Sequence, residues 1–298
     1  MPLQPSDPRH VTASTRYWIT ALVLMCVLPL SAAATDTPAW LLGGWTREWI
    51  RRDGKQSNPR DVHYVQVPKF FADVRIPVHR TVSPTARSFD DLTDTELRDL
   101  ARAQAFTGWT SVDGLTSTWH HEIDFEPPDS SPDIGRVERV ADGHILEHAM
   151  DGSYTESWRR TGAADGPFLA IRVQQEIRVD RVLLVAGDQF LYVRNRSAAL
   201  PTGRSLAQLI DATPDRATKV QYLDCEFSFG RTRGGSVPWE IQRSTLPWRQ
   251  GKHLDFVDGI TLSQGRLRPA AGTQLRGEWA VPVNTLSPEQ LRSLFPTQ

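Results

Sequence analysis

Cysteine is scarce in this 298-residue chain, which contains only Cys26 and Cys225. Cys26 lies in an apolar segment near the N-terminus that we expect to be cleaved off. Cys225 is then the single thiol of the mature chain, so no internal disulfide is expected and stability must come from burial of a core. Because no histidine lies near it in the sequence, Cys225 is expected to be buried and inert rather than a nucleophile.

An excess of positive charge is also missing. The chain has 34 Lys and Arg against 35 Asp and Glu, a formal net charge of −1. Proteins that bind nucleic acid carry a strong basic excess, so no nucleic-acid partner is expected. After the N-terminal segment no run reaches the roughly 20 apolar residues of a bilayer span. Stable membrane insertion of the mature chain is therefore not expected.

Sequence motifs for nucleophile triads, glycine-rich phosphate loops and clustered metal ligands are absent too. The sequence therefore predicts no catalytic constellation, no metal site and no cofactor. What remains is a chain that is 39% hydrophobic, with ten tryptophans and eleven phenylalanines to build a core.

Residues 1–34 have the three parts of a secretory signal peptide. Arg9 and Arg16 precede an apolar run at 18–30, and a tail of small residues follows. This basic leader, apolar core and A-x-A site predict cleavage after Ala34. An uncleaved membrane anchor is the alternative, although the run is short for one. A cleaved signal predicts a secreted or periplasmic protein.

Two stretches of the chain resemble each other at a fixed spacing. Residues 61–75 read DVHYVQVPKFFADVR and residues 180–194 read DRVLLVAGDQFLYVR, which align without a gap at an offset of 119. Further pairs at nearly the same offset are Trp119 with Trp239, Pro127 with Pro247, and Glu156-Ser157-Trp158 with Gly277-Glu278-Trp279. The common order predicts a duplication of about 120 residues, the length of a domain. The two domains are expected at 41–161 and 166–298.

Each copy has the pattern of an antiparallel β-protein, with short runs of β-branched and aromatic residues between turns. The strands expected in the first copy are 45–52, 62–67, 70–76, 105–112, 117–125, 135–141, 144–149 and 153–160. Tight hairpins are expected at Asp53-Gly54, Asp113-Gly114, Asp142-Gly143 and Asp151-Gly152. Eight strands per copy are enough to close a small barrel, so the sequence predicts two tandem barrels.

One short helix is expected to interrupt each copy. In the first copy, Thr93-Asp94-Thr95-Glu96 is a capping box for a helix that runs to about Ala103. Residues 205–211 form a shorter equivalent in the second copy. Ser287-Pro288-Glu289-Gln290 combines a cap with proline at the first helical position. A C-terminal helix is therefore expected to dock on the second barrel.

The stretch HILEH, at 144–148, fits the H-x-x-E-H pattern that one class of zinc metalloprotease carries on a helix. Asp-Gly turns flank it closely on both sides, which favours a strand. On a strand, His144 and His148 are roughly 13 Å apart at about 3.3 Å per residue. Two histidines that bind one zinc ion at about 2.0–2.1 Å cannot span that gap. The metalloprotease hypothesis is rejected, and Glu147 is expected to point to the opposite face.

The stretch WHHEIDF, at 119–125, alternates between an apolar and a polar face. The apolar face, expected to point into the barrel, carries Trp119, His121, Ile123 and Phe125. The other face, expected to be solvated, carries His120, Glu122 and Asp124. An inward His121 is either a hydrogen-bonded core histidine or a contact for a ligand or a metal.

The candidate ligand-binding residues are Asp73, Trp109, Trp119, His121, Glu147 and Glu156. Such aromatic and charged groups on shared strand faces allow two interpretations. One is an ion-pair network that closes the barrel, and the other is a pocket with a polar floor and an apolar wall. The second copy keeps Arg194 where the first has Arg75 but has Tyr192 where the first has Asp73. Features kept in both copies favour architecture, so Asp73 is a better functional candidate than Arg75.

The sequence also resembles a known family. Gly43-Gly44-Trp45 looks like the G-x-W signature of lipocalins, and FADVRIP, WHHEIDFEPP, SPDIGR and YTESW are similar to a fungal and bacterial family, the Hri-type proteins. The resemblance covers most of residues 41–283 and implies two tandem lipocalin-like barrels. The family's biochemical role is poorly defined, so the resemblance implies the fold far better than the activity. Because the fungal members are intracellular, their partners are not carried over to a chain with a signal peptide.

The leading functional hypothesis is a secreted or periplasmic, non-enzymatic protein that binds a small, largely apolar molecule in its first barrel. One alternative is an enzyme on a small hydrophobic substrate, of isomerase or hydrolase type, with Glu147 or Asp73 as general base and His121 as acid. The other is a paired-barrel scaffold that binds an unknown protein partner through its outer surface.

Overall fold

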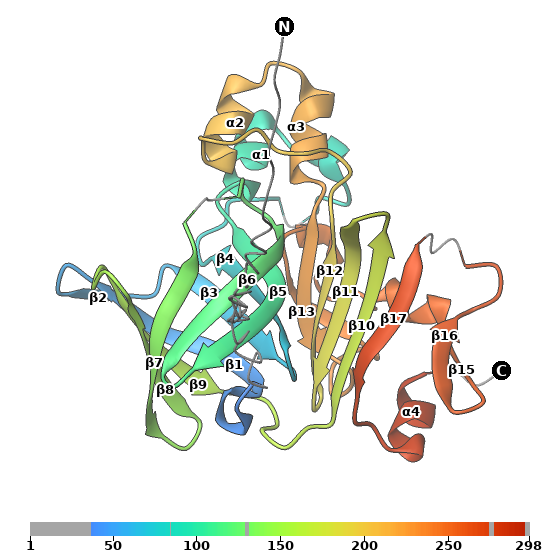
Figure 1. Cartoon of the computed structure of the whole chain (residues 1–298). Coiled ribbons are helices and arrows are strands. Elements are labelled where there is room, and N and C mark those ends of the chain that lie inside the picture. Colours follow the sequence, from blue (N-terminus) through green and yellow to red (C-terminus); the bar gives the residue numbers. More distant parts are fainter. Residues whose placement is uncertain (1–36, 84, 129–130, 274–276, 296–298) are drawn as a thin grey trace, which may run out of the picture. The chain divides into compact units, whose positions relative to one another are not determined.

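The computed structural model describes residues 37–83, 85–128, 131–273 and 277–295, and β-strands dominate this part of the chain (Figure 1). The expected signal peptide lies outside the described residues. No helix among the described residues has both the length and the apolar character needed to cross a membrane.

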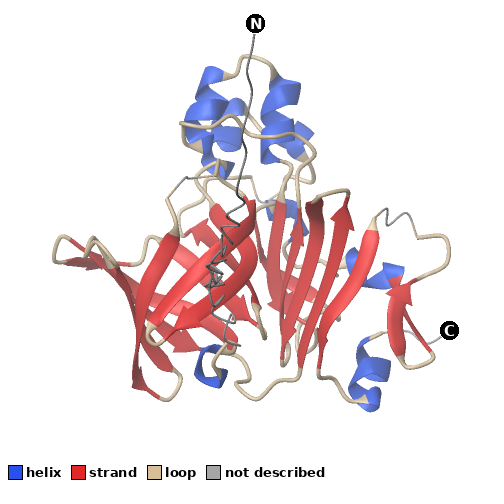
Figure 2. Cartoon of the chain, in the orientation of Figure 1, coloured by secondary structure: helices blue, strands red, loops and turns tan. Residues whose placement is uncertain are grey.

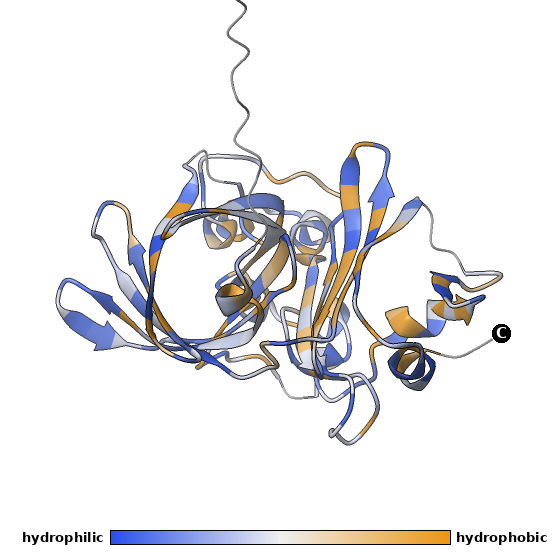
Figure 3. Cartoon of the chain, turned by 60° about the horizontal axis from the view of Figure 1, so that its bottom comes forward, coloured by the Kyte–Doolittle hydropathy of each residue, from blue (hydrophilic) through white to orange (hydrophobic). Residues whose placement is uncertain are grey.

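The first copy forms a closed barrel of eight antiparallel strands, as predicted. The strands are β1 (Gly43–Arg52), β3 (Arg60–Gln66), β4 (Phe70–Pro77), β5 (Gln104–Asp113), β6 (Thr116–Asp124), β7 (Asp133–Ala141), β8 (His144–Ala149) and β9 (Thr155–Arg160). A short strand, β2 (Lys55–Ser57), extends the sheet beside β1. Pairing of β1 with β9 closes the ring, which is visible along its axis in Figure 3. Closure leaves no free edge on these eight strands.

Local sequence explains the hairpins and the faces of the strands. Asp53 and Gly54 both have positive φ, 48° and 73°, which is the backbone of a type I′ turn. In β4, Phe71 and Asp73 face the interior of the barrel, while Val74 packs in a different core on the outer side. The period of two predicted from the sequence is therefore present here.

A β-bulge interrupts that period in β6. Gly108 of β5 pairs with His121, but the preceding residue of β5, Thr107, pairs with Ile123, so Glu122 is the extra residue. Ile123 is consequently buried in the core on the outer side of the barrel, and not inside it. The prediction that Ile123 and Phe125 point inward together with His121 was wrong, because the bulge reverses the faces after His121.

The second copy does not form a barrel, which corrects the prediction of two tandem barrels. Its strands are β10 (Phe168–Gln175), β11 (Arg178–Ala186), β12 (Gln189–Arg194), β13 (Glu226–Arg231), β14 (Glu240–Ser244) and β17 (Glu278–Asn284). They form one open sheet in the order β14-β13-β12-β11-β10-β17. That order matches β6-β5-β4-β3-β1-β9 of the barrel, without counterparts of β7 and β8.

A folded segment occupies the place where the missing strands would close the second sheet. It contains the hairpin of β15 (Ile260–Ser263) and β16 (Arg266–Pro269). Leu254, Phe256 and Leu262 pack against sheet residues such as Tyr192 in one core. These apolar side chains cover the face that would otherwise surround a cavity, so the chain needs no further strands to bury it.

The two copies share a third core between them. It joins Val74 and Phe125 of the first copy to Val193 and Phe227 of the second. Ion pairs also cross between the copies, including one between Arg172 and Glu122. Both faces of strands such as β4 and β12 are therefore buried, which explains their nearly continuous apolar sequence.

The α-helices are α1 (Asp94–Leu100), α2 (Leu206–Ala212), α3 (Arg216–Leu223) and α4 (Pro288–Leu294). The 3-10 helices are η1 (Ala39–Leu41), η2 (Phe89–Asp91), η3 (Pro247–Arg249) and η4 (Asp255–Gly259). Capping boxes at Thr93, Ser205 and Ser287 begin α1, α2 and α4. The α3 helix is a second helix in the second copy, where one was predicted. Figure 2 shows α1, α2 and α3 together, and Lys219 of α3 pairs with Asp94 of α1 at 2.6 Å.

Candidate functional site

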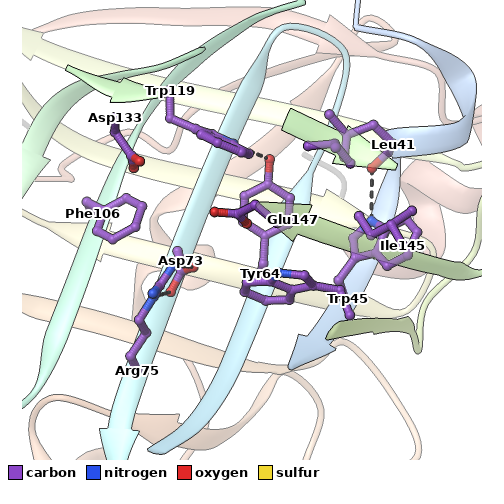
Figure 4. A pocket seen from close by; sticks show the side chains of 12 residues that line it. Leu41, Trp45, Tyr64, Asp73, Arg75, Phe106, Trp119, Asp133, Ile145 and Glu147 are labelled. Atoms are coloured by element: carbon purple, nitrogen blue, oxygen red, sulfur yellow. Dashed lines mark hydrogen bonds and ion pairs between the residues drawn. The ribbon is translucent and has the colours of Figure 1, made fainter. Parts of the chain in front are cut away.

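The first barrel encloses a small cavity, the inner cavity (Figure 4). Its wall combines large aromatic side chains with acidic and basic ones. The lining residues are Leu41, Trp45, Tyr64, Asp73, Arg75, Phe106, Trp119, Asp133, Val137, Ile145, Glu147 and Trp158. The free volume is ≈ 20 Å³, which is room for about one water molecule. Side chains therefore fill most of the depth of the barrel.

A wider pocket, the mouth, adjoins the inner cavity and shares part of its wall. Its volume is ≈ 800 Å³. The polar and aromatic residues that line it include Arg52, Arg75, Phe106, Trp119, His121, Asp124, Glu126, Asp133, Glu147, Tyr154 and Glu156. Carboxylates outnumber basic groups in this wall, so the mouth has an acidic character. A small molecule has room in the mouth, and much less in the inner cavity.

Paired charges form the boundary between the two spaces. Arg75 donates from Nε and Nη2 to the two carboxylate oxygens of Asp73, both at 3.0 Å, and its Nη1 lies 3.5 Å from Glu156. Arg47, which is 4% exposed, donates to the same Glu156 oxygen at 2.5 Å. The Arg75 guanidinium also lies 5.1 Å from the centre of the Phe106 ring. This network fixes a charged floor under the mouth.

Glu147 is the carboxyl group in this site with the most unusual environment. Burial and the negative charge of Glu156, its cross-strand neighbour, raise the pKa of Glu147 to about 8. Tyr154 donates to its Oε1 at 3.0 Å. Figure 4 shows the carboxyl group of Glu147 facing the space between Asp133, Phe106 and Asp73. At neutral pH Glu147 is therefore mainly a neutral acid exposed to the cavity.

His121 lies at the mouth between two carboxylates. Its Nδ1 is 2.7 Å from Asp124 and its Nε2 is 3.1 Å from Asp133. Burial alone would lower the pKa of His121, but the hydrogen bonds to Asp124 and Asp133 raise it to about 9. The ring also stacks on Phe106 with centroids 4.4 Å apart. The bulge at Glu122 makes this arrangement, because it turns Asp124 to the same side as His121.

A hydrogen-bonded aromatic wall lies on the other side of the inner cavity. Trp119 donates from Nε1 to the hydroxyl of Tyr64 at 3.1 Å, and that hydroxyl donates to Gln66. Gly135 of β7 makes room for this wall, since a Cβ there would lie 3.2 Å from Trp119 and 3.1 Å from Glu147. The packing leaves Trp119 in contact with both the inner cavity and the mouth.

Some buried polar atoms of the barrel have no hydrogen-bond partner among the described residues. Three of them, Nη2 of Arg47, Oε2 of Glu156 and Nε1 of Trp158, belong to residues of the charged floor or of the wall of the inner cavity. Buried polar groups nearly always have partners, because an unpaired one costs roughly 1–3 kcal/mol. Water or a polar ligand group is the natural partner at this position.

Five of the six predicted site residues lie at these two spaces. Asp73, Trp119 and Glu147 line the inner cavity, and Trp119, His121, Glu147 and Glu156 line the mouth.

Trp109, the sixth, lines neither space, so its prediction as a residue of the barrel pocket was wrong. It stacks on His120 with ring centroids 3.5 Å apart and packs against the core shared by the two copies. The shared core covers the outer face of β5 at this position, so an aromatic side chain is buried there as well as it would be inside the barrel.

Several residues of the site were not selected from the sequence, namely Arg47, Tyr64, Asp133 and Tyr154. Tyr64 and Asp133 were detectable, because they alternate in phase with inward residues of β3 and β7. Arg47 was not, since a buried arginine becomes recognisable only with its partner Glu156, 109 residues away.

The histidines of HILEH lie on a strand, as predicted from the flanking turns. His144 contacts Ser157 at 3.0 Å and His148 contacts Thr155 at 3.1 Å. Among the described residues no group of three or more His, Cys, Asp or Glu is arranged to hold a metal ion.

Comparisons with known proteins leave the function open. No family model matches the chain, and no curated protein matches it. Among solved structures, it is similar to an uncharacterized protein from Saccharomyces cerevisiae, with 10% sequence identity and a TM-score of 0.49. The alignment covers 82% of this chain and 98% of that chain. The function must therefore be argued from the site itself.

Proposed function

We propose that the mouth of the first barrel binds a small molecule that has an apolar body and a hydrogen-bonding, preferably cationic, head group. The observation that carries this proposal is a roomy mouth over a floor of buried charged groups, one of which, Glu156, has an Oε2 without a hydrogen-bond partner among the described residues. Ligand sites combine such apolar walls with a few convergent polar groups. The expected signal peptide would place this binding outside the cytoplasm.

The apolar body would lie against the aromatic side chains of the mouth. Phe106, Trp119 and Tyr154 supply these surfaces, and the stacked pair of Phe106 and His121 is preformed. Aromatic walls contribute large contact areas and attract a cation over the ring face. Because the inner cavity holds about one water molecule, the ligand is expected to stay near the mouth.

The head group would meet the acidic side of the mouth. Arg75 is already paired with Asp73, and His121 is already paired with Asp124 and Asp133. Glu126 accepts only an amide hydrogen bond from Gln104, at 2.8 Å, and has no cationic partner within 4.0 Å among the described residues. A ligand ammonium group would supply one.

Three matched probes test this proposal by isothermal titration calorimetry: phenethylamine, 2-phenylethanol and phenylacetate. They share a ring and differ in the charge of the head group. The expected order of affinity is amine, then alcohol, then acid. Tyr154→Phe, which removes the hydroxyl beside Glu147, should weaken binding of the amine. Tyr222→Phe in α3, outside the mouth, is the control. Absence of binding by all three at millimolar concentration, or equal loss in both variants, would contradict the proposal.

A proton-transfer enzyme on a small hydrophobic substrate is the second candidate. The specific observation in its favour is the pKa of Glu147, near neutrality and facing the cavity. Ionised Glu147 would accept a proton from the substrate, and the His121 imidazolium would donate one. Substrate turnover that is lost in Glu147→Gln while binding is retained would support the enzyme. Turnover that is unchanged in this variant would exclude that role for Glu147.

A further inference from the structure

A second pocket lies at one end of the open sheet, and it shares no lining residue with the barrel mouth. It is formed by the β10–β11 turn, the start of β11, the end of β12 and the residue after α3. Its volume is ≈ 400 Å³. Four arginines line it, namely Arg178, Arg181, Arg194 and Arg196, together with Glu176, Asp180 and Asp224. The pocket is thus rich in guanidinium groups.

Two of the four arginines are already neutralised within the pocket. Arg194 pairs with Asp224 at 2.7 Å, and Arg181 lies 3.2 Å from Asp180. Glu176, in the β10–β11 turn, has no cationic partner within 4.0 Å among the described residues. It is the remaining acidic group of the wall and works against an anion there.

The other two arginines have only neutral partners. Arg178 donates to the backbone carbonyl of Arg196 at 3.2 Å, and Arg196 donates to the carbonyl of Phe125. Neither guanidinium lies within 4.0 Å of a carboxylate in the described part of the chain. Arg196 is 6% exposed, and its Nε has no hydrogen-bond partner there. Burial lowers the pKa of Arg196, although the more distant Asp124 carboxylate acts in the opposite direction.

We propose that this pocket binds a small oxyanion of two or more negative charges, such as a phosphate group, between Arg178 and Arg196. A phosphate would supply both guanidiniums with a charged acceptor and would offset the cost of burying Arg196. Arginine suits this role because its planar fork donates two parallel hydrogen bonds to such an anion. The site is independent of the ligand proposed for the barrel mouth.

Titration calorimetry with inorganic phosphate at constant ionic strength tests the proposal, with chloride as the reference anion. Arg178 is exposed, so Arg178→Gln should fold and should weaken phosphate binding about tenfold, as expected for one charge-assisted hydrogen bond. Glu176→Gln should strengthen binding, because it removes the one unneutralised acid. The control is Arg233→Gln, at the opposite end of the sheet, where no change is expected.

The outcomes separate clearly. Phosphate binding that responds to Arg178 and Glu176 in opposite directions, and not to Arg233, supports the site. Tighter binding of citrate than of phosphate, with the same dependence on Arg178, would identify the anion as a polycarboxylate. Equal effects of phosphate and chloride, or unchanged binding in Arg178→Gln, would overturn the proposal.

Discussion

At the scale of single residues, Glu147 couples the stability of the protein to pH. Its pKa is raised from 4.5 to about 8, mainly by burial. Between these values the folded protein holds a proton on Glu147 that the unfolded chain has released. The unfolded state then binds fewer protons, so the contribution of Glu147 to the free energy of unfolding falls as pH rises from about 4.5 to about 8.

Replacement of Glu147 by glutamine should remove this fall, because the amide is isosteric and never ionises. We expect Glu147→Gln to gain a few kcal/mol over the natural protein between pH 5 and pH 8.5. Urea denaturation at several pH values measures the difference. Glu278→Gln, at an exposed position, is the control and should show no such trend. Parallel pH curves for the natural protein and Glu147→Gln would show that Glu147 titrates normally.

His121 should titrate far above the ordinary histidine range. Because Asp124 and Asp133 raise its pKa to about 9, stability from the imidazolium is complete below about 6.5 and is lost as pH rises through 9. We expect an NMR titration of its ring to have a midpoint near 9. Asp124→Asn should lower that midpoint by about one unit or more. A midpoint near 6.5 in the natural protein would contradict the arrangement.

The faces of individual side chains were predictable only where the strand period is unbroken. Alternation correctly placed Glu147 on the face opposite His144 and His148, and the structure shows that this face lines the inner cavity. It failed for Ile123, because no residue type signals a bulge at Glu122. Alternation also could not show that Trp109 points out of the barrel, since both faces of β5 are covered and aromatic residues occur on either one.

At the scale of elements, the bulge between β5 and β6 depends on Gly108. A Cβ at this position would lie 1.9 Å from the backbone oxygen of His120. We expect Gly108→Ala to lower the free energy of unfolding by about 2–3 kcal/mol or more, as overpacking does. Gly114→Ala is the matched control, because a Cβ there meets nothing within 4 Å and only the positive φ of 59° costs about 1 kcal/mol. Equal losses in both variants, measured by denaturation, would contradict the steric role of Gly108.

Strands and hairpins were predicted well because their signals are local. Asp-Gly turns and capping boxes act within a few residues, and they located the eight barrel strands and the starts of α1, α2 and α4. Whether the second sheet closes is not determined by signals within a few residues. Whether residues 254–269 continue as strands or fold onto the sheet face depends on apolar contacts with Leu183 and Tyr192, distant in the sequence. The sequence pattern therefore predicted a second barrel wrongly.

At the scale of the whole molecule, the shared core should make the two copies unfold together. Phe227 of the open sheet is fully buried in that core beside Val74 of the barrel. We expect Phe227→Ala to cost about 3–5 kcal/mol. Hydrogen exchange measured by mass spectrometry should then accelerate in β4 as much as in β12. Faster exchange confined to the second copy, or two separate thermal transitions, would show that the copies are independent.

The folded segment on the open sheet makes the two halves of the chain structurally unequal. In the second half, leucine and phenylalanine side chains of this segment cover one face of the open sheet. The other face of the sheet packs against the outside of the barrel. The barrel therefore gains apolar burial on its outer side as well as in its interior. Because part of the stabilising burial lies outside, the interior can carry ionisable groups such as Asp73 and Glu147 in positions where a barrel standing alone would need apolar side chains.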